Sequence, residues 1–158
     1  MLTWSRFNFQ YCPKIVIFNT RKECLLCKRR WEQDFDGIFW FPWWKREITD
    51  QSIEAGITRE IKEELGDSVV LQVYRLFNIE MEYVKKAGDT MILPHYLAIY
   101  KWGDIVINPD EYSEYRWIEI DYIDSINTIP TVKWIIKNFL SFQEVMEISN
   151  DQSFIINN

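Results

Sequence analysis

The chain of 158 residues contains no uninterrupted apolar run that approaches the length of a membrane span. Its first residues also lack the apolar core of a secretory signal peptide, so we expect a cytoplasmic protein with no membrane partner. Disorder is excluded by an apolar fraction of 47% and an aromatic fraction of 16%. We expect a single domain at residues 1–149 and a polar, frayed tail at residues 150–158.

Cysteine and histidine are both scarce. The Cys24–Cys27 spacing is typical of zinc and redox sites, but no second pair accompanies it. The pair also lies in a predicted strand rather than at the start of a helix, so we expect it and Cys12 to be buried, reduced thiols. His95, the single histidine, lies in an apolar strand, which favours a hydrogen-bonded structural role over that of a general base.

An excess of basic residues is also missing, because the formal net charge is -6. Polymeric nucleic acid normally requires a basic face on the protein, so we do not expect it as a partner. A small polyphosphate is compatible with this charge, since a bound cation can offset the repulsion.

Apolar periodicity predicts the secondary structure. Strands are expected at 14–18, 23–30, 39–42, 77–83, 90–102 and 115–120. Helices are expected at about 51–65 and from Pro130 onward, where apolar residues recur on one side. Strands on either side of a central helix, followed by a hairpin and a closing helix, predict a mixed sheet covered by helices, an α/β/α sandwich.

Three glutamates dominate the first predicted helix. Glu60, Glu63 and Glu64 are spaced to project from one face. Like charges at this spacing repel by roughly 3 kcal/mol at an effective dielectric of 20, so a cation among them is expected. Oxygen ligands favour Mg²⁺ or Mn²⁺. The alternative is a solvated acidic surface without a ligand.

The surroundings of the glutamates favour the metal site. Ala55, Ile61 and Leu65 form an apolar stripe that pins one side of the helix to the core and turns the glutamates outward together. Gly66 is expected to end the helix.

Residues 59–66, Arg-Glu-Ile-Lys-Glu-Glu-Leu-Gly, resemble the second half of the signature of the Nudix, or MutT-like, hydrolases. That signature reads G-x5-E-x7-R-E-U-x-E-E-x-G-U, with U aliphatic, and would span 45–67. Segments 24–30, 39–42 and 111–117 resemble the family's flanking segments. The resemblance covers roughly residues 14–140 and implies the same sandwich fold.

The first half of the signature departs from the family pattern. The differences are Lys45 for the opening glycine, Gln51 for the first glutamate, Asp67 for the closing aliphatic residue, and Pro42-Trp43-Trp44 for Pro-Gly-Gly. Gln51 cannot form the ion pair with Arg59 that the family's glutamate forms, although its amide can accept a hydrogen bond. We therefore expect an altered loop with the metal-binding positions retained.

The resemblance implies catalytic roles for five residues. Glu63 and Glu64 would be direct ligands of Mg²⁺, with Mn²⁺ as a substitute, and Glu60 a ligand or a water-orienting base. Arg59 would orient these carboxylates and shield them from one another. Glu111 matches the family's acidic loop position and would be the distal base.

Further candidates are less specific. Glu114 is the second choice as distal base, and a solvated turn explains either acidic residue equally well. Candidate phosphate contacts are Arg29, Arg30, Lys45 and Arg46. Of Trp43 and Trp44, one is expected to face inward and the other outward as a stacking platform. Lys45 could also block the ligand or be solvated, and Glu80 could border the pocket or be exposed.

The expected activity is Mg²⁺-dependent hydrolysis of a nucleoside diphosphate linked to another group. The flanking segments are most similar to those of dATP or dihydroneopterin triphosphate pyrophosphohydrolases, which implies release of a monophosphate and pyrophosphate. Two alternatives are a nucleotide-sugar pyrophosphatase and a Nudix fold that binds a nucleotide without hydrolysing it. A third is an interaction protein with an aromatic docking surface. The sequence leaves the oligomeric state open, including a homodimer.

Overall fold

The computed structural model describes residues 8–31, 34–43, 47–146 and 153–156. In chain order its elements are β1 (Phe9–Tyr11), β2 (Lys14–Phe18), β3 (Cys24–Arg29), β4 (Phe39–Trp40), α1 (Ile53–Leu65), β5 (Val70–Val84), β6 (Thr90–Trp102), β7 (Tyr112–Ile118), the 3-10 helix η1 (Ile120–Ser125), α2 (Pro130–Met146) and β8 (Ser153–Ile156). No helix among these residues has the length and hydrophobicity needed to cross a bilayer.

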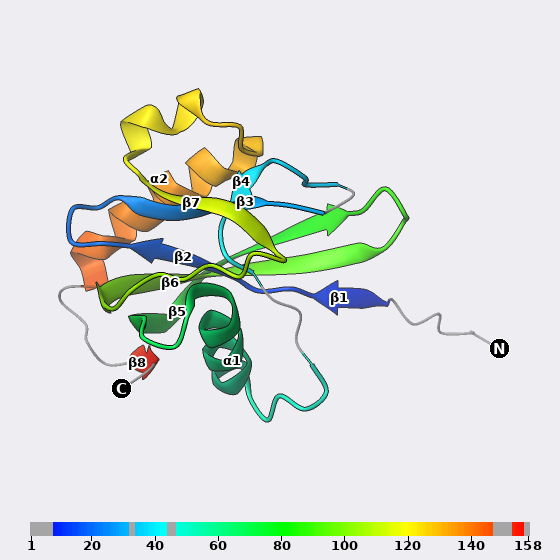
Figure 1. Cartoon of the computed structure of the whole chain (residues 1–158), viewed down its shortest axis with the longest axis horizontal. Coiled ribbons are helices and arrows are strands. Elements are labelled where there is room, and N and C mark those ends of the chain that lie inside the picture. The colour runs from blue at the N-terminus through cyan, green and yellow to red at the C-terminus, as the bar shows by residue number, and fades with distance from the viewer. Residues whose placement is uncertain (1–7, 32–33, 44–46, 147–152, 157–158) are drawn as a thin grey trace.

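The strands form one mixed sheet in the order β4-β3-β2-β6-β5-β8, with β1 pairing to β6 and β7 to β3. Strands β1 and β2 run parallel to β6, while the β5–β6 and β3–β7 pairs are antiparallel. Helices α1 and α2 cover opposite faces of the sheet (Figure 1), and each helix packs on its own apolar cluster. This arrangement confirms the predicted α/β architecture.

Helix α1 begins and ends where its local sequence favours it. The Ser52 hydroxyl accepts a hydrogen bond from the backbone N–H of Ala55 at 3.0 Å, so the helix starts two residues later than predicted. Gly66 ends the helix at a φ of 99°, a conformation that favours glycine. The backbone N–H of Asn108 donates to the carbonyl of Glu64 at 3.0 Å, which ties the segment before β7 to the end of α1.

The apolar stripe of α1 differs from the predicted one. Ile57, Ile61 and Leu65, four residues apart, are buried, whereas Ala55 is exposed. Glu64 is buried on the same side, because it lies three residues after Ile61. The prediction that all three glutamates turn outward together is therefore wrong for Glu64.

The predicted fraying after residue 149 is wrong for residues 153–156. They form β8, which pairs antiparallel with β5, and Ile156 is buried. The predictions for the scarce residues are confirmed: the three cysteines are buried free thiols, and His95 is buried with Nδ1 3.1 Å from the carbonyl oxygen of Ile79.

Candidate functional site

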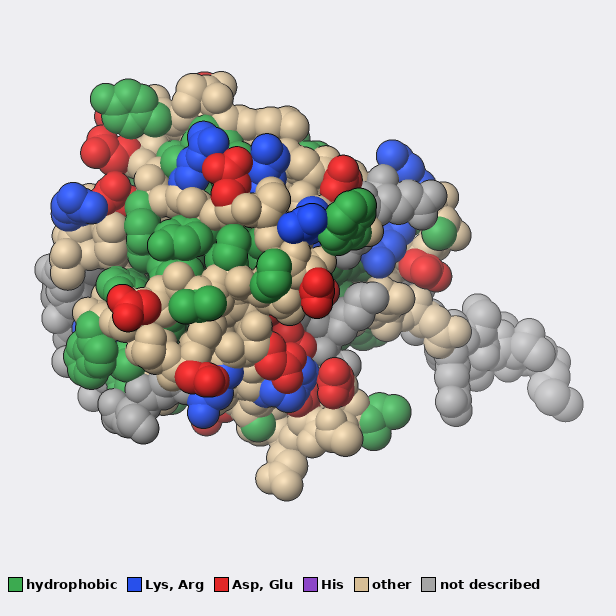
Figure 2. All heavy atoms as spheres, viewed as in Figure 1, with side chains coloured by type: hydrophobic (Ala, Val, Ile, Leu, Met, Phe, Trp, Pro, Cys, Tyr) green, Lys and Arg blue, Asp and Glu red, His purple; other side chains and the backbone are tan. Residues whose placement is uncertain are grey.

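Arg59 lies at the centre of a cluster of carboxylates at the exposed side of α1. Its Nε and Nη2 donate to the two carboxylate oxygens of Asp50 at 3.0 and 3.1 Å. Its Nη1 donates to Glu60 at 2.6 Å and to Glu63 at 3.2 Å. One edge of the guanidinium therefore binds Asp50, and the opposite nitrogen faces two of the predicted metal ligands. Acidic and basic side chains gather over α1 on this face of the molecule (Figure 2).

Burial distinguishes the three predicted ligands. Glu63 is exposed, Glu60 is partly buried, and Glu64 is only 7% exposed. Burial raises the pKa of Glu60 to about 6, opposed by its hydrogen bond with Arg59. The charged form of these carboxylates is therefore less favourable the more deeply the side chain is buried.

Glu64 is held by β7. The hydroxyl of Tyr112, itself buried, donates a hydrogen bond to Oε2 of Glu64. The pKa of Glu64 is raised to about 8: burial is the main cause and nearby Glu60 and Glu111 add to it, while the Tyr112 hydrogen bond and Arg29 act in the opposite direction. Residues from α1, β3 and the start of β7 therefore meet at one place.

Arg29 and Glu111, two of the predicted site residues, form an ion pair. Arg29 Nη2 lies 3.1 Å from Oε2 of Glu111, and the side chains are 2% and 42% exposed respectively. The guanidinium carbon lies 5.1 Å from the ring centroid of Tyr112. Arg29 thus joins the predicted base to the group that holds Glu64.

The chemistry of the three glutamates fits a hard divalent cation, although they do not yet surround one point. No three carboxylate, histidine or cysteine side chains among the described residues are arranged to hold a metal ion. Glu60 and Glu63 share a nitrogen of Arg59, while Glu64 turns to Tyr112. All donors are oxygens, and Glu60 raises the pKa of Glu64, a repulsion that a cation would relieve. Glu60, Glu63 and Glu64 would be the residues that hold such a cation.

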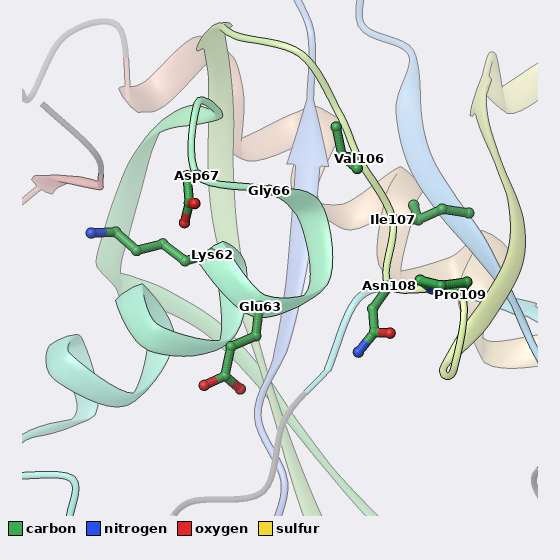
Figure 3. Close-up of a pocket in the computed structure, with 8 residues that line it drawn as sticks. All are labelled: Lys62, Glu63, Gly66, Asp67, Val106, Ile107, Asn108 and Pro109. Carbon is green, nitrogen blue, oxygen red and sulfur yellow. The ribbon is translucent and has the colours of Figure 1, made fainter.

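An open groove borders Glu63 at the end of α1 (Figure 3). It is lined by Lys62, Glu63, Gly66, Asp67, Val106, Ile107, Asn108 and Pro109. The polar ends of Glu63 and Asn108 point to the same end of the groove, whereas Lys62 extends away from it. Asp67, the residue in place of the family's aliphatic one, is exposed at the other end.

Of the two aromatic candidates, the structure describes Trp43. Trp43 is 7% exposed, and its ring is covered by Lys14 Nζ at 4.6 Å and by the Arg29 guanidinium at 4.7 Å. It is therefore the inward-facing tryptophan of the pair and offers no free stacking surface. Trp44 lies outside the described residues, as do Lys45 and Arg46.

Three other candidates, Glu114, Arg30 and Glu80, lie outside the carboxylate cluster around Arg59. Glu114 pairs with Arg116 at 3.0 Å and with Lys28 at 3.5 Å. The guanidinium of Arg30 lies 4.9 Å from the ring centroid of Trp31. Glu80 is exposed on β5, opposite Pro94 of β6 in the register.

Sequence reasoning missed Asp50 and Tyr112. Asp50 directly precedes Gln51, so an acidic residue next to a substituted position was the available signal. Tyr112 follows Glu111 in a segment that the prediction included, but nothing in the sequence indicates that its hydroxyl reaches Glu64, 48 residues earlier.

Comparison with known proteins gives a family and a fold. The profile described as NUDIX domain matches residues 11–140, whereas no curated protein matches the chain. The structure is similar to a Caenorhabditis elegans Ap4A hydrolase solved as a binary complex, with a TM-score of 0.70 and 18% identity over 85% of this chain and 98% of that one. It is also similar to the NUDIX domain of Shewanella oneidensis NrtR in complex with ADP ribose (TM-score 0.67, 15% identity, 86% and 89% covered).

A third similar structure is the MutT protein from Methanosarcina mazei Go1, with a TM-score of 0.65 and 20% identity over 85% of this chain and 95% of that one. At these identities the structural similarities show the fold alone. The profile match, in contrast, covers most of the chain, including α1 and the Glu111 segment. The chain therefore belongs to the Nudix hydrolases, a family of pyrophosphohydrolases that typically use a divalent metal ion.

Proposed function

We propose that this protein hydrolyses the phosphoanhydride bond of a nucleoside diphosphate linked to another group. The preferred substrate class is a (deoxy)nucleoside triphosphate, giving the monophosphate and pyrophosphate, with Mg²⁺ as the cofactor. The observation that carries the proposal is the position of Glu64 close to Glu60 and to the Arg29–Glu111 ion pair, together with the contacts of Arg59 with both Glu60 and Glu63.

The proposed metal ligands are Glu60, Glu63 and Glu64. These residues would hold a divalent cation, which would supply Lewis-acid chemistry and neutralise charge on the phosphoryl oxygens. Arg59 hydrogen-bonds to both Glu60 and Glu63 from one nitrogen, which orients the two carboxylates and screens their charges from one another. Tyr112 fixes the orientation of Glu64 from the opposite side.

Glu111 is the proposed base. Its carboxylate is 42% exposed, so water and substrate can reach it, while Arg29 fixes one of its oxygens. Glu111 takes a proton from the attacking water, whose oxygen forms a bond to the α-phosphorus as the anhydride P–O bond breaks. The leaving pyrophosphate carries away the electron pair of that bond.

The proposed substrate class rests on the ligand of one similar structure and on the resemblance of two segments to known pyrophosphohydrolases. ADP ribose, bound by the NUDIX domain of S. oneidensis NrtR, supports a nucleoside diphosphate derivative as the ligand class. The preference for a triphosphate depends on the resemblance of segments 39–52 and 111–117 to triphosphate pyrophosphohydrolases. A nucleotide sugar is the alternative, because it carries the same diphosphate.

The test is hydrolysis of a panel of nucleoside triphosphates, nucleotide sugars and ADP ribose with Mg²⁺ or Mn²⁺. Products are identified by chromatography, and turnover in ¹⁸O-water shows which phosphorus is attacked. We expect label in the nucleoside monophosphate, and loss of turnover in Glu63→Gln. Asp124→Asn removes the same charge from a surface pair with Lys133 and serves as the control with unchanged turnover.

Three outcomes would contradict the proposal in different ways. Cleavage of nucleotide sugars alone would change the substrate class. A nucleotide that raises the melting temperature without any turnover would indicate a binding module. No binding of nucleotide or metal at all would favour an interaction protein.

A further inference from the structure

The loop before α1 contains an acidic residue, Asp50, directly next to a departure from the family signature. Gln51 occupies the position of the family's first glutamate, yet its side chain is exposed. Among the described residues, it has no side-chain hydrogen bond or ion pair. The preceding residue, Asp50, makes the contact with Arg59 instead.

The geometry of the Asp50–Arg59 pair is specific. Two parallel hydrogen bonds of 3.0 and 3.1 Å join the carboxylate to Nε and Nη2 of Arg59. Such a bidentate arrangement fixes the plane of the guanidinium as well as its position. The remaining nitrogen, Nη1, then points at Glu60 and Glu63.

Asp50 is itself held in place. Its side chain is only 4% exposed, and its Oδ2 accepts a hydrogen bond from the backbone N–H of Glu47 at 2.8 Å. Its own N–H donates to the carbonyl of Glu47 at 3.1 Å, which closes the turn at residues 47–50. This turn brings a shorter side chain, one residue earlier, within reach of Arg59.

The other carboxylates near Arg59 are poorer anchors. Glu47 lies 3.7 Å from Nη1 and is mostly exposed, and Glu63 is an exposed i,i+4 partner. Exposed pairs of this kind are weak, because solvent and salt screen them. Glu60, with a side chain that is 16% exposed, binds Nη1 alone at 2.6 Å, whereas Asp50 is more buried and binds two nitrogens, so Asp50 sets the plane of the guanidinium.

We propose that Asp50 is a positioning residue that replaces the family's missing glutamate: it fixes Arg59 so that the guanidinium orients Glu60 and Glu63 for the metal ion. This inference rests on the proposed function, because orientation matters only if these glutamates bind a cation. It predicts that the altered signature retains its activity, through a carboxylate shifted by one position.

The first experiment measures Mn²⁺ binding without nucleotide, by electron paramagnetic resonance, together with kcat and KM of the full chain. In Asp50→Asn, Mn²⁺ affinity and kcat should each fall about 10–100-fold, as for lost partners of metal ligands, while KM changes less than about threefold. Asp50→Glu should retain both within about threefold. Gln51→Ala should match the wild type.

Loss of charge must be separated from loss of geometry. Glu47→Gln removes one negative charge near Arg59 without touching the bidentate pair, so its effect should stay below about threefold. In an Arg59→Ala background, Asp50→Asn should have no further effect on Mn²⁺ affinity, because Asp50 acts through Arg59. An equal loss in both backgrounds would overturn the inference.

A measurement on the wild-type protein covers the case in which Asp50→Asn fails to fold. The ¹⁵N–¹H resonance of Arg59 Nε should be resolved and slow to exchange with water, since that hydrogen is held by Asp50. A fast-exchanging resonance would overturn the inference. If the resonance is protected but the wild type neither binds Mn²⁺ nor hydrolyses nucleotides, the proposed function has failed and the ion pair is only structural.

Discussion

Helix α1 covers one face of the sheet and helix α2 the other, and each face buries a titratable side chain. On the α1 face, Glu64 is bound by Tyr112 and lies close to Arg29 and Glu111, of which the last is exposed to solvent. On the α2 face, His95 lies next to Phe41, a member of the apolar cluster under α2, at 5.7 Å between ring centroids.

The difference between these two groups lies in what surrounds them. Glu64 lies close to Arg29 and to partly exposed Glu111, whereas His95 is buried, and both its burial and the charge of nearby, equally buried Lys14 favour the neutral ring. Burial alone therefore does not indicate a functional group. A path of polar contacts to solvent distinguishes the candidate site from a structural residue.

The largest expected effect comes from exchanging each buried group for a neutral amide. Glu64→Gln should lower kcat more than about 100-fold, because it removes a ligand and not merely a ligand's partner. His95→Gln should change kcat less than about threefold. Steady-state kinetics with Mg²⁺ on both variants measure this, and equal losses would remove the distinction between the two faces.

The next effect concerns acid stability. Burial lowers the pKa of His95 to about 3 from its ordinary 6.5, so the unfolded chain binds that proton first. His95 should therefore contribute a loss of about 2–3 kcal/mol to the free energy of unfolding between pH 7.5 and pH 4.5, while the raised pKa values of Glu60 and Glu64 act in the opposite direction. Urea unfolding should show the His95 contribution as the difference between the pH profiles of the wild type and of His95→Gln, because Glu60 and Glu64 are present in both. Identical pH profiles would contradict the prediction.

Removal of one hydroxyl on the α1 face should have a smaller effect. Tyr112→Phe leaves the ring under Arg29 but withdraws the hydrogen bond to Glu64. We expect kcat to fall about 10-fold and the free energy of unfolding by about 1–2 kcal/mol. Tyr122→Phe, at an exposed tyrosine of η1, is the matched control. Kinetics and denaturant unfolding of both variants would show whether these losses are specific to removal of the Tyr112 hydroxyl.

The smallest effect should follow loss of the helix cap. Ser52→Ala removes the side-chain acceptor for the N–H of Ala55 and should cost about 1 kcal/mol of stability. The kcat should change less than about twofold, since Asp50 and Arg59 keep their contact. A large loss of activity at unchanged stability would mean that the cap itself orients the site.

Most of the fold could be predicted because it depends on local patterns. The β5–β6 hairpin follows from alternating apolar residues, and the end of α1 follows from Gly66. The buried side of α1 was only partly predicted. The predicted apolar stripe was centred one or two residues away from the observed one. The prediction therefore included Ala55 instead of Ile57 and placed Glu64 on the solvent side, whereas the structure buries it.

The site itself depended on contacts that no local pattern contains. Asp50 reaches Arg59 through a turn whose shape is not periodic, and the hydroxyl that binds Glu64 comes from another strand. Strand β8 was missed for a similar reason: its apolar run is short, and only pairing with β5 makes it a strand. The sequence therefore indicated the candidate metal ligands more clearly than it indicated the residues that hold those ligands in place.

The C-terminal strand has a practical consequence for anyone who shortens the protein. β8 covers the backbone of β5 at residues 71–74, which would otherwise be an open sheet edge. Proteolysis before Ser153 would expose those amide and carbonyl groups to strands of neighbouring molecules. Truncated material should then form aggregates at concentrations where the intact chain stays dispersed, even though every carboxylate around Arg59 is still present.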